Sequence, residues 1–262
     1  MIDVNTIDSY LLMQGDCMEK LKEIPSGSIE LILCDPPYNL SKYSTGNMKF
    51  EWRSDINNDV AKWDLKELAP ADFLEEFKRV LSPTGNIFVF TSYNLVGKWH
   101  QIFDSEFDTF QFMVWHKTNP VPNIRKSSFL NSCELIVCMW NKGHTWNFSR
   151  QNEMHNFIES PICLGNERLK SPKHPTQKPL NVLKQIIKIA SRENDLVLDM
   201  FMGVASTGVA ARQLNRRFIG IEIDDEYFKA CEKRMKESKV TVIELNSFNE
   251  AELYKKAGKV GT

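Results

Sequence analysis

The sequence predicts a three-layer α/β fold with a mostly parallel, doubly wound sheet, and three observations support this prediction. Apolar runs of strand length alternate with helical periodicity, most clearly after residue 180. A glycine-containing loop, residues 199–208, lies between an apolar run and a helical pattern, where a doubly wound sheet places its ligand loops. The 262 residues can bury a sizeable core, and neither a repeat nor a low-complexity tract divides them. We therefore expect a single domain over residues 1–262.

The start of the chain predicts two strands, a helix and a stiff loop. Residues 10–15 and 29–33 are apolar runs of strand length, and residues 17–24 have the pattern of a short helix. The second strand leads into Asp35-Pro36-Pro37-Tyr38, where each proline fixes its own φ and the first restricts Asp35 to extended backbone. This loop presents a carboxylate, carbonyls and a ring, which suits a flat group bearing an exocyclic amine. The alternative is an ordinary proline-rich turn with a surface tyrosine.

The middle of the chain mixes long polar segments with regular structure. Residues 39–69 are polar, aromatic and aperiodic, as functional loops often are. The regular elements that we expect next are a helix over 70–81, a strand over 86–90, and strands over 112–116 and 134–140 at one edge of the sheet. Residues 141–172 are again polar and predict irregular structure.

The last third of the chain has the clearest periodicity. It predicts, in order, a helix over 180–190, a strand over 196–198, the loop 199–208, a helix through Leu214, a strand over 217–223 and a helix to about Ser238. Asp224 has the chemistry to cap that last helix. Residues 239–262 follow as a C-terminal tail.

Composition bounds the class of protein. The net charge of −1 neither supports nor excludes a nucleic-acid partner. The six cysteines include no Cys-x-x-Cys pair, so we expect reduced thiols and no metal site. The chain shows no signal-peptide pattern and no run of about 18 apolar residues, so we expect a cytoplasmic protein without a membrane partner.

The loop at residues 199–208 predicts a nucleotide site. Gly203 lets the backbone approach a ligand closely, and Glu222 ends the next strand 23 positions after Asp199, a spacing that suits a carboxylate on ribose hydroxyls. The loop lacks both the Gly-x-Gly-x-x-Gly pattern and the Gly-Lys-Ser/Thr phosphate signature. S-adenosylmethionine, which carries ribose but no pyrophosphate, fits that difference. A tight strand–helix turn with an incidental acid is the alternative.

Three segments together resemble the β class of DNA amino-methyltransferases. They are the tetrapeptide at residues 35–38, the run His174-Pro175-Thr176-Gln177-Lys178-Pro179 and the loop at residues 199–208, in this order. The resemblance covers roughly residues 10–238. It implies a Rossmann-like methyltransferase fold with permuted motif order, in which the catalytic motif precedes the cofactor motif. The strands that end at Asp35 and Asp199 are then expected to be neighbours.

The resemblance also implies which residues act. The catalytic residues are Asp35, Pro36, Pro37 and Tyr38: carboxylate and Pro36 carbonyl accept hydrogens from the target amine, and Tyr38 stacks on the extruded base. The residues that bind S-adenosylmethionine are Asp16, Cys17, Asp35, His174, Thr176, Lys178, Asp199, Phe201, Gly203, Ala205, Ser206, Thr207 and Glu222. The loop departs from the family pattern, Asp-Pro-Phe-x-Gly-Ser-Gly-Thr, at Met200 and at residues 204–206. Ala205, where glycine is usual, costs backbone freedom.

We expect the substrate to be the N6 amine of a flipped adenine in DNA, because the tetrapeptide begins with aspartate rather than serine. Cytosine N4 and RNA remain alternative targets, and a non-catalytic nucleotide-binding regulatory module is an alternative of another class. Target recognition is expected in residues 39–69 and 117–172, the long polar segments outside the core. DNA is the implied partner, and the resemblance leaves open a homodimer and a restriction endonuclease acting on the same site.

Overall fold

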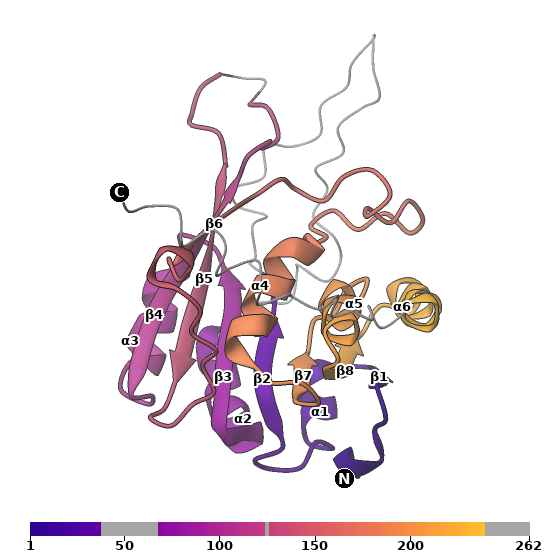
Figure 1. Cartoon of the computed structure of the whole chain (residues 1–262). Helices are drawn as coiled ribbons and strands as arrows, with labels where there is room; N and C mark the ends of the chain where they lie inside the picture. The colour runs from indigo at the N-terminus through magenta and orange to yellow at the C-terminus, as the bar shows by residue number, and fades with distance from the viewer. Residues whose placement is uncertain (38–67, 124–125, 239–262) are drawn as a thin grey trace, which may run out of the picture.

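An eight-stranded sheet forms the centre of the molecule, with helices on both faces (Figure 1). The computed structural model describes residues 1–37, 68–123 and 126–238. Its strands lie in the order β1-β8-β7-β2-β3-β5-β4-β6. Their bounds are β1 Tyr10–Gln14, β2 Ile29–Cys34, β3 Leu81–Thr91, β4 Thr109–Lys117, β5 Cys133–Trp140, β6 Phe157–Ser160, β7 Leu196–Asp199 and β8 Arg217–Glu222. All neighbouring pairs are parallel except β3 with β5 and β4 with β5.

The helices divide into two layers. They are α1 Cys17–Leu21, α2 Pro70–Val80, α3 Val96–Phe103, α4 Leu180–Ala190, α5 Ser206–Gln213 and α6 Asp225–Glu237, with short 3-10 helices at Val4–Thr6 and Gln151–Glu153. The core is correspondingly split in two. Ile32 and Cys34 of β2 pack with the α2 and α3 side chains, whereas Leu31 and Leu33 pack with those of α4. Alternate residues of β2 thus bury opposite faces, which explains why a central strand is apolar throughout.

The sheet reverses its strand order between β2 and β7. These two strands are parallel neighbours, with Ile32 opposite Leu198, so Asp35 and Asp199 follow adjacent carboxyl ends. The prediction that these two strands are neighbours is confirmed. From this point α2 leads toward β3 on one side, and α5 leads toward β8 on the other. Ligands of doubly wound sheets bind at such a switch point.

Several predictions about the helices and strands are confirmed, and three need correction. Helix α4 has the expected bounds, and Asp224 caps α6 by accepting from Glu226 N and Tyr227 N. The prediction that residues 141–172 are irregular is wrong at β6, which pairs with β4. Only Ile158 and Ser160 of β6 face inward, too few residues to reveal a strand period. Helix α3 was not predicted.

The third correction concerns β3, which begins at Leu81 rather than at Asn86. Leu81 pairs with Ile29, and an irregular register between Ile29 and Leu31 accommodates the Ser-Pro-Thr-Gly segment at residues 82–85. None of the helices in the described ranges is long and apolar enough to cross a membrane.

Candidate functional site

A pocket of about 360 Å³ opens where β2 and β7 end. It is lined by Cys34, Asp35, Phe90, His174, Thr176, Gln177, Lys178, Leu183, Asp199, Phe201, Met202, Gly203, Val204, Ser206 and Thr207. All three segments that suggested the family therefore meet at one place, although the first and the last are separated by more than 160 positions in the sequence.

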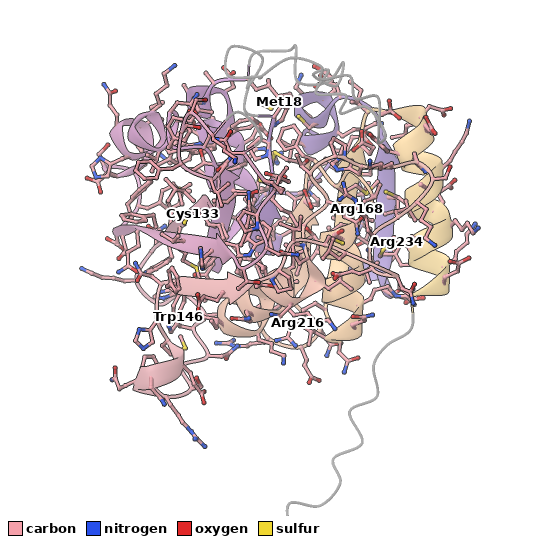
Figure 2. The ribbon with its side chains drawn as sticks, turned by 90° about the horizontal axis from the view of Figure 1, so that it is seen from above. Met18, Cys133, Trp146, Arg168, Arg216 and Arg234 are labelled. Atoms are coloured by element: carbon pink, nitrogen blue, oxygen red, sulfur yellow. The ribbon has the colours of Figure 1, made fainter. Side chains whose placement is uncertain are left out.

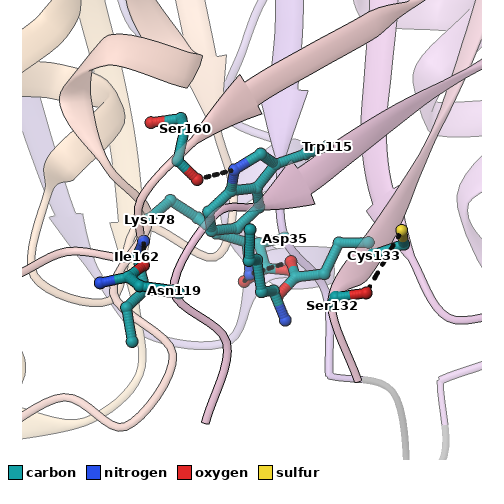
Figure 3. Close-up of polar contacts among 10 residues, drawn as sticks. Asp35, Trp115, Asn119, Ser132, Cys133, Ser160, Ile162 and Lys178 are labelled. Atoms are coloured by element: carbon teal, nitrogen blue, oxygen red, sulfur yellow. Dashed lines mark hydrogen bonds and ion pairs between the residues drawn. The ribbon is translucent and has the colours of Figure 1, made fainter. Parts of the chain in front are cut away.

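An ion pair joins the first two segments. The Lys178 ammonium contacts Asp35 Oδ2, and it also lies 3.2 Å from Glu134 Oε2 (Figure 3). The same ammonium lies 4.9 Å from the centre of the Phe90 ring. Burial lowers the pKa of Lys178, but Asp35 and Glu134 outweigh burial and hold that pKa above its ordinary value. Lys178 is therefore a permanent positive charge beside Asp35.

Backbone amides and Glu222 shape the loop after β7. Asp199 Oδ1 accepts from Phe201 N at 3.0 Å, and Glu222 Oε2 accepts from Gly203 N at 2.9 Å. The other oxygen of Glu222 accepts from Asp224 N at 2.8 Å. The carboxylate at the end of β8 thus fixes the loop at the end of β7, and both acids lie at the same edge of the sheet.

Helix α6 supports the same loop from the other side, which sequence reasoning did not foresee. Cys231 Sγ donates to Gly203 O at 3.0 Å, and Arg234 Nη1 donates to Val204 O at 2.6 Å and lies 3.1 Å from Ser206 Oγ. Seen from above, Arg234 lies on the α6 side of the molecule, away from Cys133 at the start of β5 (Figure 2). These contacts hold Ala205, whose φ of 57° is left-handed, where glycine is the usual residue.

Burial shifts the pKa values of Asp199, Glu222 and His174 in and around this pocket. Burial raises the pKa of Asp199 to about 7, against hydrogen bonds from Thr207 and Phe201 N that lower it. Burial likewise raises the pKa of Glu222 to about 7. Burial, with Lys178 and Arg168, lowers the pKa of His174 to about 4. His174 is therefore neutral at physiological pH, while the two acids titrate near it.

Gly203 is required because the His174 ring packs against it. Its φ is +52°, and a Cβ built there would lie 2.8 Å from His174 Nε2. The His174 ring itself packs against the Tyr227 ring at a tilt of 56°, with the ring centres 4.8 Å apart. A side chain at position 203 must therefore displace the ring that lines the pocket.

We expect Gly203→Ala to lower both the melting temperature and the affinity for the pocket's ligand. The left-handed backbone alone costs about 1–2 kcal/mol with alanine, and the clash with His174 adds to it. Gly165→Ala is the matched control, since Gly165 has a φ of +59° and open space around its Cβ position. Thermal denaturation of both variants separates the two contributions. Equal losses of stability would show that the His174 contact has no role.

Of the residues predicted to bind or act, nine line this pocket. They are Asp35, His174, Thr176, Lys178, Asp199, Phe201, Gly203, Ser206 and Thr207. Ala205 is buried behind the loop, and Cys17 is buried in the core. Asp16 caps α1 by accepting from Met18 N and Glu19 N. Asp16 and Glu222 nevertheless follow or end adjacent strands, since Gly15 N donates to Glu222 O at 2.9 Å.

The tetrapeptide is described in part. Pro36 and Pro37 follow Asp35 at the end of β2, whereas Tyr38 and residues 39–67 lie outside the described residues. Asn119 and Asn123 hold the β4–β5 connection: Asn119 Oδ1 accepts from Ile162 N, and Asn123 Nδ2 donates to Ser128 O. Asn123 thus stabilises a turn within this connection, whereas Asn119 joins its start to the chain after β6.

Comparisons with known proteins agree on one family. Residues 29–233 match the model of the N6 and N4 methyltransferase family, described as DNA methylase. The type II methyltransferase M.HinfI of Haemophilus influenzae is 36% identical over 253 residues, covering 87% of this chain and 68% of that protein. The type II methyltransferase M2.LlaDCHI of Lactococcus lactis subsp. cremoris is 32% identical over 248 residues, covering 87% of this chain and 90% of that protein.

Solved structures share the fold. The M1.HpyAVI–SAM complex has a TM-score of 0.61 at 27% identity, covering 86% of this chain and 99% of that one. The cytosine-N4-specific PvuII DNA methyltransferase has a TM-score of 0.65 at 19% identity, covering 96% and 93%. At that identity the likeness extends to the fold alone.

Proposed function

Because this chain belongs to the DNA methylase family, whose members methylate exocyclic amines, we propose that its target is the N6 amine of adenine. The chain is a site-specific DNA methyltransferase, and the finer choice of base rests on one observation. The tetrapeptide begins with Asp35, and this carboxylate lines the same pocket as the cofactor loop. An aspartate at this position resembles the adenine enzymes of the class.

The pocket suits S-adenosylmethionine. Gly203 lets the His174 ring pack closely against the loop, Ser206 and Thr207 add hydroxyl groups, and Asp199 adds a carboxylate. Glu222, which holds Gly203 N, ends β8 at the same edge and is placed to accept hydrogen bonds from ribose. When bound, the cofactor supplies an activated methyl group.

The chain's own residues prepare the acceptor. The lone pair of an exocyclic amine is delocalised into its ring, so the free amine is a weak nucleophile. The Asp35 carboxylate and the Pro36 carbonyl accept its two hydrogens and favour a pyramidal nitrogen. This geometry orients the lone pair for in-line attack. The base must leave the duplex to reach the pocket, and Tyr38 stacks on it.

Target recognition is assigned to residues 39–69 and 117–172, as parts of one catalytic domain spanning residues 1–262. The second segment includes β5 and β6, so its recognition surface is the connections rather than the whole segment. The β4–β5 connection rises above the sheet at the edge where the pocket lies (Figure 1). Phe129 in this connection is fully exposed.

The test is to express the protein in a host lacking DNA methylation and to digest its DNA to nucleosides. We expect mass spectrometry to find N6-methyladenine and no N4-methylcytosine above the empty-vector control. Modified-base sequencing of the same DNA then gives the recognition site. N4-methylcytosine would transfer the assignment to cytosine. Cofactor binding without any methylated base in DNA or RNA would support the regulatory module.

A further inference from the structure

Four charged side chains form a compact cluster at the pocket, and two of them, Asp35 and Lys178, line it. Lys117 Nζ lies 2.8 Å from Glu134 Oε1, and the other Glu134 oxygen lies 3.2 Å from Lys178 Nζ. Lys178 in turn contacts Asp35. The four groups come from β4, β5, the segment before α4 and the end of β2. The two carboxylates and the two ammonium groups balance in charge.

The antiparallel direction of β5 brings Glu134 into this cluster. β5 runs antiparallel to β3 and β4, so its first residues lie at the carboxyl edge of the sheet, and Glu134 is opposite Trp115. Only 22% of the Glu134 side chain is exposed. A buried carboxylate is costly unless it is paired, and Glu134 is paired with two lysines.

The titratable groups around Lys178 come from several elements of the fold. Asp35 and Glu134 face it directly, Lys117 reaches it through Glu134, and His174 on its own segment is neutral. Burial raises the pKa of Glu134, but Lys178 and Lys117 more than offset this and hold that pKa below its ordinary value. Glu134 is therefore ionised at neutral pH.

We propose that Glu134 is a positioning residue for methyl transfer, sharing the Lys178 ammonium with Asp35 and thereby setting how tightly Lys178 holds the Asp35 carboxylate. The inference rests on the proposed function, because it assumes that Asp35 receives the target amine. When Glu134 is ionised, its carboxylate and that of Asp35 share the positive charge of Lys178. Lys178 then fixes the position of Asp35 without fully neutralising the Asp35 charge. Without that charge, Lys178 pairs more closely with Asp35 and competes with the amine for its oxygens.

The test compares Glu134→Gln with wild type in steady-state methylation of host DNA lacking the modification. We expect kcat to fall roughly tenfold to a hundredfold, as when an outer partner of a functional group is removed, with the Kd for S-adenosylmethionine unchanged within about twofold. The alkaline limb of the kcat–pH profile should move to lower pH, because one of the two acids that raise the pKa of Lys178 is gone. Glu134→Asp, which keeps the charge, should recover much of the rate and restore the limb.

Glu106→Gln is the matched control. Glu106 also pairs with a lysine, 2.5 Å from Lys78 Nζ, but it neither lines the pocket nor lies in the segments assigned to target recognition. We expect wild-type kcat and an unchanged pH profile. Equal losses in both variants would show a general effect of removing surface charge and would overturn the proposal.

A second readout does not depend on methyl transfer. The proteins are treated at pH 9 with an amine-acylating reagent, and Lys178 labelling is measured by peptide mass spectrometry against exposed Lys188. We expect Lys178 to be protected in wild type and to react several-fold faster in Glu134→Gln. Equal protection in the two proteins, or wild-type kcat and pH profile for Glu134→Gln, overturns the proposal. Failure of wild type to methylate any DNA refutes the proposed function instead, and the labelling still tests the Lys178 contact.

Discussion

Asp35→Ala is expected to lower kcat for methyl transfer by at least about 10²–10³-fold, the loss seen when one preorganised group aimed at a transition state is removed. Asp35 supplies the carboxylate of the tetrapeptide, and it lies at the end of β2 beside the cofactor loop. Without its carboxylate the amine loses the acceptor that favours a pyramidal nitrogen. The Pro36 carbonyl can accept one of the two amine hydrogens, and the other hydrogen is left without its carboxylate acceptor.

The same variant should still fold and bind S-adenosylmethionine. Lys178 keeps Glu134 at 3.2 Å, so its charge is not left without a counter-ion. The contacts that shape the loop, Glu222 with Gly203 N and Arg234 with Val204 O, do not involve Asp35. Isothermal calorimetry should give a Kd within about threefold of wild type, a change of less than about 1 kcal/mol.

Exposed Asp8 provides the control at the opposite edge of the sheet, close to Ser9, whose carbonyl accepts from Phe218 at the start of β8. Asp8→Ala should methylate DNA at the wild-type rate. Near-normal turnover by Asp35→Ala on unmodified DNA would falsify the assignment of Asp35. Loss of cofactor binding together with turnover would instead make Asp35 part of the cofactor site.

Strongly periodic elements and parallel neighbours were predictable because local signals determine them. Helix α4 buries Val182, Leu183, Ile186, Ile187 and Ala190, a spacing that leaves no doubt about its face. The meeting of Asp35 and Asp199 followed from a general rule, since parallel strands of a doubly wound sheet place their carboxyl ends at one edge. To apply that rule, only the two strand ends in the sequence and the strand order implied by the family were needed.

Residues that support the site from outside the motifs were not predictable in the same way. Glu134 reaches Lys178 because β5 is antiparallel, and the apolar run that predicts this strand does not give its direction. Arg234 reaches the loop because α6 packs beside α5, and on sequence it is one of many cations on an amphipathic helix. An isolated acid at the start of an apolar strand was the available signal for Glu134.

The pKa values of Asp199 and Glu222 predict that the cofactor-free protein loses stability as pH rises. Asp199 moves from an ordinary value of 3.8 to about 7, because burial disfavours its charged form. Glu222 moves from 4.5 to about 7 for the same reason. Protons are then held more tightly by the folded than by the unfolded state. The stabilisation that these two acids contribute is therefore fully present below about pH 4 and is lost as the pH rises to about 7.

Asp199→Asn should remove most of the Asp199 contribution. The amide oxygen can still accept from Phe201 N, and no buried charge remains. A shift from 3.8 to about 7 corresponds to roughly 4 kcal/mol at most, so we expect the melting temperature at pH 8 to rise by several degrees. At pH 5 the gain should be smaller, because only part of that window has been crossed.

Bound cofactor should offset the stability gain of Asp199→Asn. This effect distinguishes an acid that serves cofactor binding from one that serves only the fold. S-adenosylmethionine carries a positively charged sulfonium, and an ionised Asp199 in the pocket wall favours binding a cation. Differential scanning fluorimetry at pH 8 with saturating cofactor should show a smaller thermal shift for Asp199→Asn than for wild type. If the variant gains stability without the cofactor and keeps the full shift with it, the buried charge at Asp199 serves neither the fold nor the cofactor. If the variant gains nothing at pH 8, the hydrogen bonds from Thr207 and Phe201 N offset the cost of burying the Asp199 charge.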